Sequence, residues 1–395
     1  MAVFRWLVAG ATALAVVGVV GYRVLAPHDT LTVAQRPYPA AEVAPFLRIG
    51  VLTSAPLIVD NRIRVYAEKS RVWADSPVSS RTQLSPFWAY RRWPAALVGV
   101  MAVESVPVVV SRWSDGALVA LDARTGRVAW RSRISPGGRY TGRRTGSATV
   151  YSPVGLYTAR SAADGTPVVV ADGRAFDART GRPLWTVPRG CDTWTTATAY
   201  VVADCTGGLV LYDAGDGRPI GAWRGQAAGR GRAAGRLTPF GCALGHSGCE
   251  LFEAGQGFWR IGHDAAVSPE PWAHAMSDLV LGDTLVESEP DQYVALVDRA
   301  TGVRRWVQPV SGRVVAVDAS GVYVVTRAID LSVLDLATGM EDDRLGLRGT
   351  DTRAWTPGRV ELHDGFIAIE RITGRPRDGD DRYFYGGTPV VLAGI

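Results

Sequence analysis

The sequence predicts an all-β protein, a single β-propeller of four-stranded blades, with eight blades preferred and seven possible. Three observations lead to this fold class. A turn with an acidic residue four positions before a glycine recurs along the chain, strand-like runs flank each copy, and no amphipathic helix of useful length follows residue 30. Blades of this kind must stack around a ring, because one repeat cannot bury both of its faces alone.

The repeat is clearest in three stretches: LDARTGRVAW (121–130), FDARTGRPLW (176–185) and VDRATGVRRW (297–306). An aspartate carboxylate accepts hydrogen bonds from the backbone N–H groups that follow it, and glycine takes the positive φ that closes a hairpin. The turn and strand residues predicted from these copies are Asp122, Gly126 and Trp130, then Asp177, Gly181 and Trp185, then Asp298, Gly302 and Trp306.

Weaker copies extend the repeat over most of the chain. They are Asp213–Gly217, Glu253–Gly257, Asp335–Gly339, Glu370–Gly374 and a shortened copy, VYAEKSRVW, at 65–73. Successive glycines of the seven full copies are 55, 36, 40, 45, 37 and 35 residues apart, which is the size of a propeller blade. Eight turns therefore predict eight blades. The strand-like C-terminus, 383–395, is expected to pair with strands around 57–66 and close the ring.

The Asp-x-x-Thr-Gly-x-x-x-Trp pattern resembles the repeat of the pyrroloquinoline-quinone (PQQ)-type β-propellers. The resemblance covers roughly residues 50–395. That superfamily holds quinoprotein dehydrogenases and also non-enzymatic members, among them a barrel-assembly lipoprotein of the bacterial outer membrane. Lys69 is the only lysine among 43 basic residues, a bias that indicates a GC-rich genome and an actinobacterial-type source.

The chain departs from the enzymatic branch of that superfamily. Its dehydrogenases carry adjacent cysteines and a calcium site with an aspartate base, and this sequence has no Cys-Cys pair and no motif for the calcium ligands. The five histidines are scattered, and no Gly-x-Ser-x-Gly elbow or P-loop occurs. We therefore expect no catalytic site and no cofactor. The repeat tryptophans are interpreted as apolar filler between blades, with stacking on a flat cofactor as the alternative.

The N-terminus holds 17 uncharged residues from Trp6 to Tyr22, at the lower edge of the ~17–25 that span a bilayer. The predicted domains are a signal anchor or transmembrane helix at 1–26, a linker at 27–48 and the propeller at 49–395. This arrangement predicts a single-pass membrane protein with its propeller on the extracytoplasmic side. Cleavage of the segment and secretion is the alternative.

Cysteine usage also favours export. Of the three possible connectivities, the predicted bridges are Cys191–Cys205 and Cys242–Cys249, which need an oxidising compartment. A zinc site does not fit this spacing. The acidic stretch PRDGDDR, 376–382, lacks the ligand order of a calcium loop and is interpreted as a solvated hairpin tip.

The predicted binding surface lies opposite the Asp-x-x-Thr-Gly turns. The long connections that leave each tryptophan strand, at about 74–94, 131–148, 224–237 and 260–277, should emerge together on that face. The candidate binding residues are Arg139, Tyr140, Arg143, Arg144, Arg230, Arg232 and Arg236. A positive face attracts acidic partners, here another envelope protein or an anionic envelope polymer. The alternative is that these loops are simply solvated.

These observations favour a monomeric binding or scaffold module for cell-envelope assembly or sensing. Nucleic acid is not expected as a partner, because no aromatic residues interleave as a stacking platform. The alternative function is an exported enzyme, either a PQQ-dependent dehydrogenase or a glycan-acting propeller.

Overall fold

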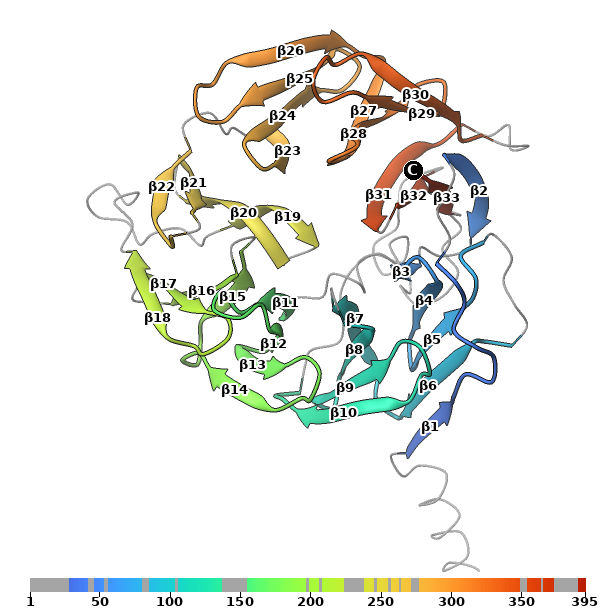
Figure 1. Ribbon diagram of the computed structural model, residues 1–395, viewed down its shortest axis with the longest axis vertical. Coiled ribbons are helices and arrows are strands. Elements are labelled where there is room, and N and C mark those ends of the chain that lie inside the picture. Colours follow the sequence, from blue (N-terminus) through green and yellow to red (C-terminus); the bar gives the residue numbers. More distant parts are fainter. Residues whose placement is uncertain are drawn as a thin grey trace, which may run out of the picture.

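A computed structural model describes residues 28–41, 46–52, 56–79, 85–103, 106–136, 155–196, 199–205, 208–223, 238–244, 247–254, 257–262, 264–270, 277–348, 354–363, 365–372 and 390–395. These residues form eight antiparallel sheets arranged as the blades of one closed propeller (Figure 1). The all-β fold and the blade count of eight are therefore confirmed. Within the described ranges no helix is long and apolar enough to cross a bilayer. The expected anchor at 1–26 lies outside them.

Each of the first seven blades consists of four strands that follow one another in sequence. Blade 1 comprises β3 (Leu57–Val59), β4 (Ile63–Glu68), β5 (Arg71–Asp75) and β6 (Trp88–Trp93), and blade 2 comprises β7 (Leu97–Val103), β8 (Val108–Trp113), β9 (Ala117–Asp122) and β10 (Val128–Arg133). Blade 3 comprises β11 (Leu156–Arg160), β12 (Pro167–Ala171), β13 (Arg174–Asp177) and β14 (Pro183–Thr186), and blade 4 comprises β15 (Asp192–Thr195), β16 (Tyr200–Cys205), β17 (Gly208–Asp213) and β18 (Pro219–Trp223).

Blade 5 comprises β19 (Thr238–Leu244), β20 (Ser247–Ala254), β21 (Gly257–Ile261) and β22 (Val267–Pro269). Blade 6 comprises β23 (Ser277–Leu281), β24 (Thr284–Glu289), β25 (Tyr293–Asp298) and β26 (Arg304–Pro309), and blade 7 comprises β27 (Gly312–Asp318), β28 (Gly321–Thr326), β29 (Asp330–Leu334) and β30 (Glu341–Gly346). The first strand of each blade lies toward the centre of the ring and the last lies at the rim, as the order from β7 to β10 shows in Figure 1.

Blade 8 closes the ring with strands from both ends of the chain. It contains β31 (Thr356–His363), β32 (Phe366–Ile372), β33 (Val390–Gly394) and, at the rim, β2 (Leu47–Leu52). The prediction that the C-terminus pairs with residues 57–66 is wrong, because β33 pairs with β2. Residues 57–66 already have antiparallel partners within blade 1, so the free edge of β33 pairs with β2, the strand that precedes them in sequence.

A fifth strand, β1 (His28–Thr32), adds to the rim of blade 1 by pairing with β6. It lies within the stretch expected to be a linker, 27–48, and nothing in the repeat pattern predicts it. Because β1 runs antiparallel to β6, His28 lies beside Trp93, where β6 leaves the blade.

The core is divided among the contacts between neighbouring blades. Each described hydrophobic cluster joins two blades; one, for example, joins Val110 and Leu118 of blade 2 to Val169 and Phe176 of blade 3. A separate cluster contains Ile58 of blade 1 and residues of blade 8, so the closing interface is packed like the others. Apolar side chains on both faces of every blade are what the ring needs, because each sheet is covered on two sides.

The acid-and-glycine turns occupy two different positions in the blades. Those that begin at Asp122, Asp177, Asp213, Asp298 and Asp335 join the third strand to the fourth. The copies at Glu253 and at 65–73, expected to be equivalent to these, lie instead between the second and third strands. The copy expected at 370–374 begins within β32, the second strand of blade 8, and residues 373–389 separate that strand from β33. The copies at 65–73 and at Glu253 are short connections between antiparallel strands, as the third-to-fourth-strand turns are, and both positions favour the same residues, so spacing alone does not separate them.

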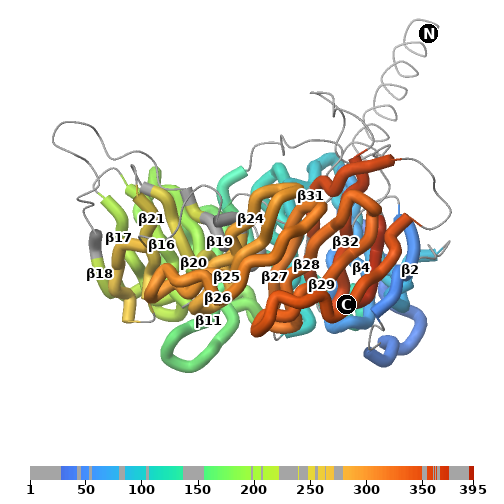
Figure 2. Tube along the Cα trace, turned by 90° about the horizontal axis from the view of Figure 1, so that it is seen from above, coloured from blue at the N-terminus to red at the C-terminus, as the bar shows by residue number. Residues whose placement is uncertain are grey.

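These positions define the two faces of the ring, which Figure 2 shows edge-on. We call the face with the third-to-fourth-strand turns the turn face, and the opposite face, where blades are joined to one another, the connection face. The prediction of a connection at 74–94 on the connection face is wrong, because this stretch contains β6, and the loop within it joins β5 to β6 on the turn face. The stretches 131–148 and 224–237 continue from β10 and β18. These are equivalent rim strands, and both end on the connection face.

Candidate functional site

The hydrogen-bond geometry that recurs in the turns of this chain explains the Asp-x-x-Thr-Gly pattern. Asp122 Oδ1 accepts hydrogen bonds from the backbone N–H of Arg124 and of Thr125, both at 2.9 Å, and from the Thr125 hydroxyl at 3.1 Å. The same three bonds occur at the turns that begin with Asp177, Asp298 and Asp335. At Asp335 the hydrogen bonds from Thr338 lower the pKa of the carboxyl, and at Asp298 the bond from Arg305, with those from Thr301, lowers it to about 2.

In four blades a tryptophan of the fourth strand attaches the blade to the next one. Trp130 Nε1 donates to the Ala178 carbonyl oxygen at 2.8 Å, and its ring covers Gly181, where a Cβ would lie 2.6 Å from Cδ2. Trp88, Trp185 and Trp306 make the equivalent bonds to Ala123, Ala214 and Leu336. Glycine is required in these turns for its positive φ and for the close approach of the ring.

These tryptophans do not fit a quinone site. Their rings and Nε1 groups are engaged at blade contacts, as the interpretation as filler predicts. Cys191 and Cys205 are not adjacent in sequence, and their disulfide joins the first two strands of blade 4. Among the described residues, no three His, Cys, Asp or Glu side chains are grouped so that they could hold a metal ion.

An ion-pair cluster replaces the tryptophan between blades 5 and 6. Arg299 follows the turn residue Asp298, and its guanidinium contacts Glu250 at 2.8 Å and Glu270 at 3.1 Å. Arg299 and Glu270 are both buried. Sequence reasoning missed this cluster, although an arginine in place of the small residue that follows Asp122 and Asp177 was a signal.

The segment after residue 27 is held firmly on blades 1 and 2. Arg92 contacts Asp29 at 2.6 Å and Asp115 at 2.7 Å, and Arg131 contacts Asp29 at 3.2 Å. Burial raises the pKa of the Asp115 carboxyl, but the hydrogen bonds it accepts, first from Arg92, outweigh burial and lower it. At Tyr90, burial and then the neighbouring Asp29 raise the pKa to about 12.

Beyond β1, the chain crosses the turn face. Ala34 N–H donates to the Thr125 carbonyl at 2.9 Å, and the Tyr38 hydroxyl donates to Asp60 at 3.0 Å. The Tyr38 ring also lies 6.3 Å from that of Phe87. We call residues 28–41 the N-terminal strap.

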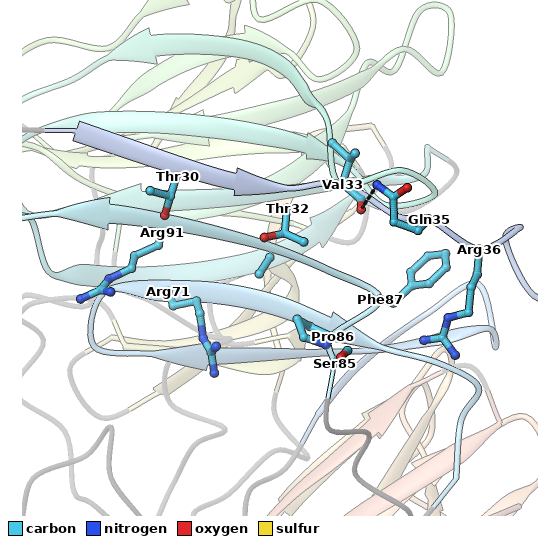
Figure 3. A pocket seen from close by; sticks show the side chains of 11 residues that line it. Thr30, Thr32, Val33, Gln35, Arg36, Arg71, Ser85, Pro86, Phe87 and Arg91 are labelled. Carbon is cyan, nitrogen blue, oxygen red and sulfur yellow. Dashed lines mark hydrogen bonds between the residues drawn. The ribbon is translucent and has the colours of Figure 1, made fainter.

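The candidate binding site lies between the strap and blade 1. It is a cavity of about 800 Å³ lined by Thr30, Thr32, Val33, Gln35, Arg36, Arg71, Ser85, Pro86, Phe87, Ala89 and Arg91 (Figure 3). Three arginines and no carboxylate line it. We call it the arginine trough.

Strand alternation explains how the trough forms. Trp88 and Arg92 of β6 contact blade 2, so Ala89 and Arg91 point to the other side of the sheet. On that side the cross-strand neighbours of Arg91 are Thr30 of β1 and Arg71 of β5. The three residues form one row across the sheet, and all three line the cavity.

The predicted binding residues lie elsewhere. Arg139, Tyr140, Arg143, Arg144, Arg230, Arg232 and Arg236 fall outside the described residues, as does the acidic stretch at 376–382. Sequence reasoning missed the trough, because its three arginines are separated in sequence. The pairing of β5 with β6 brings Arg71 and Arg91 together, and the pairing of β1 with β6 brings the strap beside them.

The cysteine prediction is confirmed for one bridge. Cys191 and Cys205 form a disulfide within blade 4. Cys249 is also disulfide-bonded, and its Cα partner across the β19–β20 ladder is Cys242, whose side chain lies outside the described residues.

One family of known proteins matches part of the repeat region. Residues 47–220, from β2 into β18, match the family described as outer membrane protein assembly factor BamB. No curated protein matches the chain.

Several solved structures are similar to it. BamB from Moraxella catarrhalis is 15% identical, with a TM-score of 0.44, over 92% of this chain and 100% of that one. The computationally designed Ika8 protein is 14% identical, with a TM-score of 0.49, over 89% and 100%. The C-terminal WD40 domain of Sif2 is 11% identical, with a TM-score of 0.49, over 90% and 99%.

Proposed function

Because the chain is a PQQ-like β-propeller repeat protein, we propose that it is a membrane-anchored, extracytoplasmic binding or scaffold module for cell-envelope assembly or sensing. The observation that carries this proposal is the arginine trough, a concave site with three cations and no carboxylate in its lining. Such a site favours an anionic partner, either an envelope protein or an anionic envelope polymer.

The disulfide supports the compartment. A Cys191–Cys205 bridge persists in an oxidising environment and is rare in the cytosol. The matched family is described as an assembly factor of the outer membrane, and we extend to this chain only the general role of binding other envelope components.

The strap supports an orientation for the molecule. Asp29, held by Arg92 and Arg131, keeps His28 at the connection face, so the proposed anchor joins the propeller there. β10 and β18 end on the same face; the arginine-rich stretch 131–148 begins with the last residues of β10, and 224–237 follows β18. We propose that this face is turned toward the membrane and its anionic components, with Arg139, Tyr140 and Arg236 among the contacting residues.

Cross-linking in intact cells tests this function. A photo-reactive residue at Thr32, in the trough, should give adducts with envelope components, and the same residue at Val303, exposed in a turn of blade 6, should not. Adducts only with cytosolic proteins, or equal adducts from both positions, would contradict the proposal.

Retention on an anionic polymer tests the proposed face separately. Replacing Arg143, Arg144, Arg230 and Arg232 with serine should weaken salt-sensitive retention of the full chain, with the trough arginines still in place, and leave its melting temperature nearly unchanged. Equal retention of the variant and the wild type would remove these residues from the binding surface.

A further inference from the structure

We propose that the arginine trough binds an extended segment of a phosphate-bearing polyol or glycan, with one phosphate group at Arg71 and Arg91 and another at Arg36. This inference rests on the proposed function of binding envelope components. It goes further, since it assigns the site and the chemistry of the ligand.

The first observation is a pair of like charges on one face of a sheet. Arg71 and Arg91 are direct cross-strand neighbours, and like charges in that arrangement are destabilising. Arg71 contacts Glu68 at 2.6 Å, whereas the described residues provide no ion pair for Arg91. An anion held by both guanidinium groups would remove the repulsion, and the planar fork of donors on arginine fits phosphate oxygens.

The second observation is the separation of the cations. Figure 3 shows Arg71 and Arg91 at one end of the trough and Arg36 at the other. Arg36 is exposed and lies over the Phe87 ring, 6.0 Å from its centroid. A ligand with one anionic group can contact the arginines at only one end of the trough. The geometry therefore favours a ligand that carries at least two anionic groups.

The third observation is the lining between the two ends. Thr30, Thr32, Gln35 and Ser85 present hydroxyl and amide groups, which both donate and accept hydrogen bonds, as the hydroxyls of a polyol or sugar require. Thr32 lies opposite Ala89, whose small side chain leaves the middle of the trough open.

This lining also decides against an acidic peptide. Peptides gain affinity from large apolar or aromatic side chains seated in pockets. The one aromatic residue in the lining, Phe87, is only 2% exposed, so it offers little apolar surface to such an anchor. Hydroxyl-rich walls with arginine at both ends match a chain of alternating phosphate and hydroxyl groups better.

Isothermal titration calorimetry on the detergent-solubilised full chain tests the proposal. The probe is a synthetic glycerol phosphate hexamer, compared with hexaglutamate, maltohexaose and inorganic phosphate. The hexamer should bind more tightly than any of the other three, and more weakly as salt rises. The double variant Arg36→Ser/Arg91→Ser should bind it at least about tenfold more weakly, since each hydrogen bond to a charged group contributes about that factor or more.

A matched variant controls for net charge. Arg127→Ser/Arg179→Ser removes two exposed arginines from the turns of blades 2 and 3 and should bind the hexamer like the wild type. Equal melting temperatures of the three proteins would show that folding is unaffected.

Four results would overturn the inference. Absence of hexamer binding would exclude the ligand class, and binding of hexaglutamate with equal or higher affinity would indicate a peptide surface. Equal affinity for inorganic phosphate would exclude an extended ligand. Unchanged affinity in the double variant would place the site elsewhere. None of these results would affect the cross-linking outcome at Thr32, so the two proposals fail separately.

Discussion

The contact of a tryptophan with the glycine of the next blade makes a quantitative prediction for Gly181→Ala. Gly181 has φ +71°, a conformation that costs an L-residue about 1–2 kcal/mol. An added Cβ would lie 2.6–2.7 Å from three ring atoms of Trp130, whose Nε1 is fixed by its bond to Ala178. Overpacking of this kind costs about 1–3 kcal/mol. The expected loss of unfolding free energy is therefore about 2–5 kcal/mol.

Gly165→Ala provides the matched control in the same blade. Gly165 has φ +69°, but nothing lies within 4 Å of the position of its Cβ. This variant should lose only the backbone cost of about 1–2 kcal/mol. Urea unfolding midpoints of both variants, compared at equal slope, measure the difference. If the two variants lose the same stability, or Gly165→Ala loses more, the tryptophan does not hold the turn as described.

Three further predictions concern two contacts between blades and one hydrogen-bonded turn. Trp130→Phe should cost about 1–3 kcal/mol in urea unfolding, because the buried Ala178 carbonyl loses its hydrogen bond; no loss would contradict this. Arg299→Leu should cost up to about 3–5 kcal/mol by the same assay, because the buried Glu270 then keeps only Arg260, at 4.0 Å, and an unchanged midpoint would show that the pair is dispensable. The pKa of Asp298 is lowered from 3.8 to about 2, so its stabilising effect is complete above pH 3.8 and lost as pH falls toward 2. The melting temperature of Asp298→Asn should therefore approach that of the wild type over this range, and a constant difference would contradict the assignment.

The sequence predicted the parts of the fold that depend on local chemistry. Asp122, Gly126 and Trp130 form a turn and a strand as expected, because aspartate bonding and positive φ act within a few residues. The eight-blade prediction was confirmed, although three of the eight copies lie after the second strand of their blade and not after the third. Local preference identifies a tight turn but not its place in the blade.

The features that the sequence did not predict depend on long-range pairing. β2 completes blade 8 and β1 extends blade 1, and no repeat pattern marks either strand. The arginine trough follows from the pairing of β1, because Thr30 reaches Arg91 only in that register. Loops rich in arginine were visible in the sequence, whereas a row of three residues from three strands was not.

The state of the four cysteines in protein isolated from its own cells tests most directly the central claim that the propeller works outside the cytoplasm. Mass spectrometry of peptides alkylated before any reduction measures it. The account predicts two linked peptides, Cys191–Cys205 and Cys242–Cys249, and no alkylated cysteine. Four alkylated thiols in the mature protein would contradict both the bridges and the oxidising compartment.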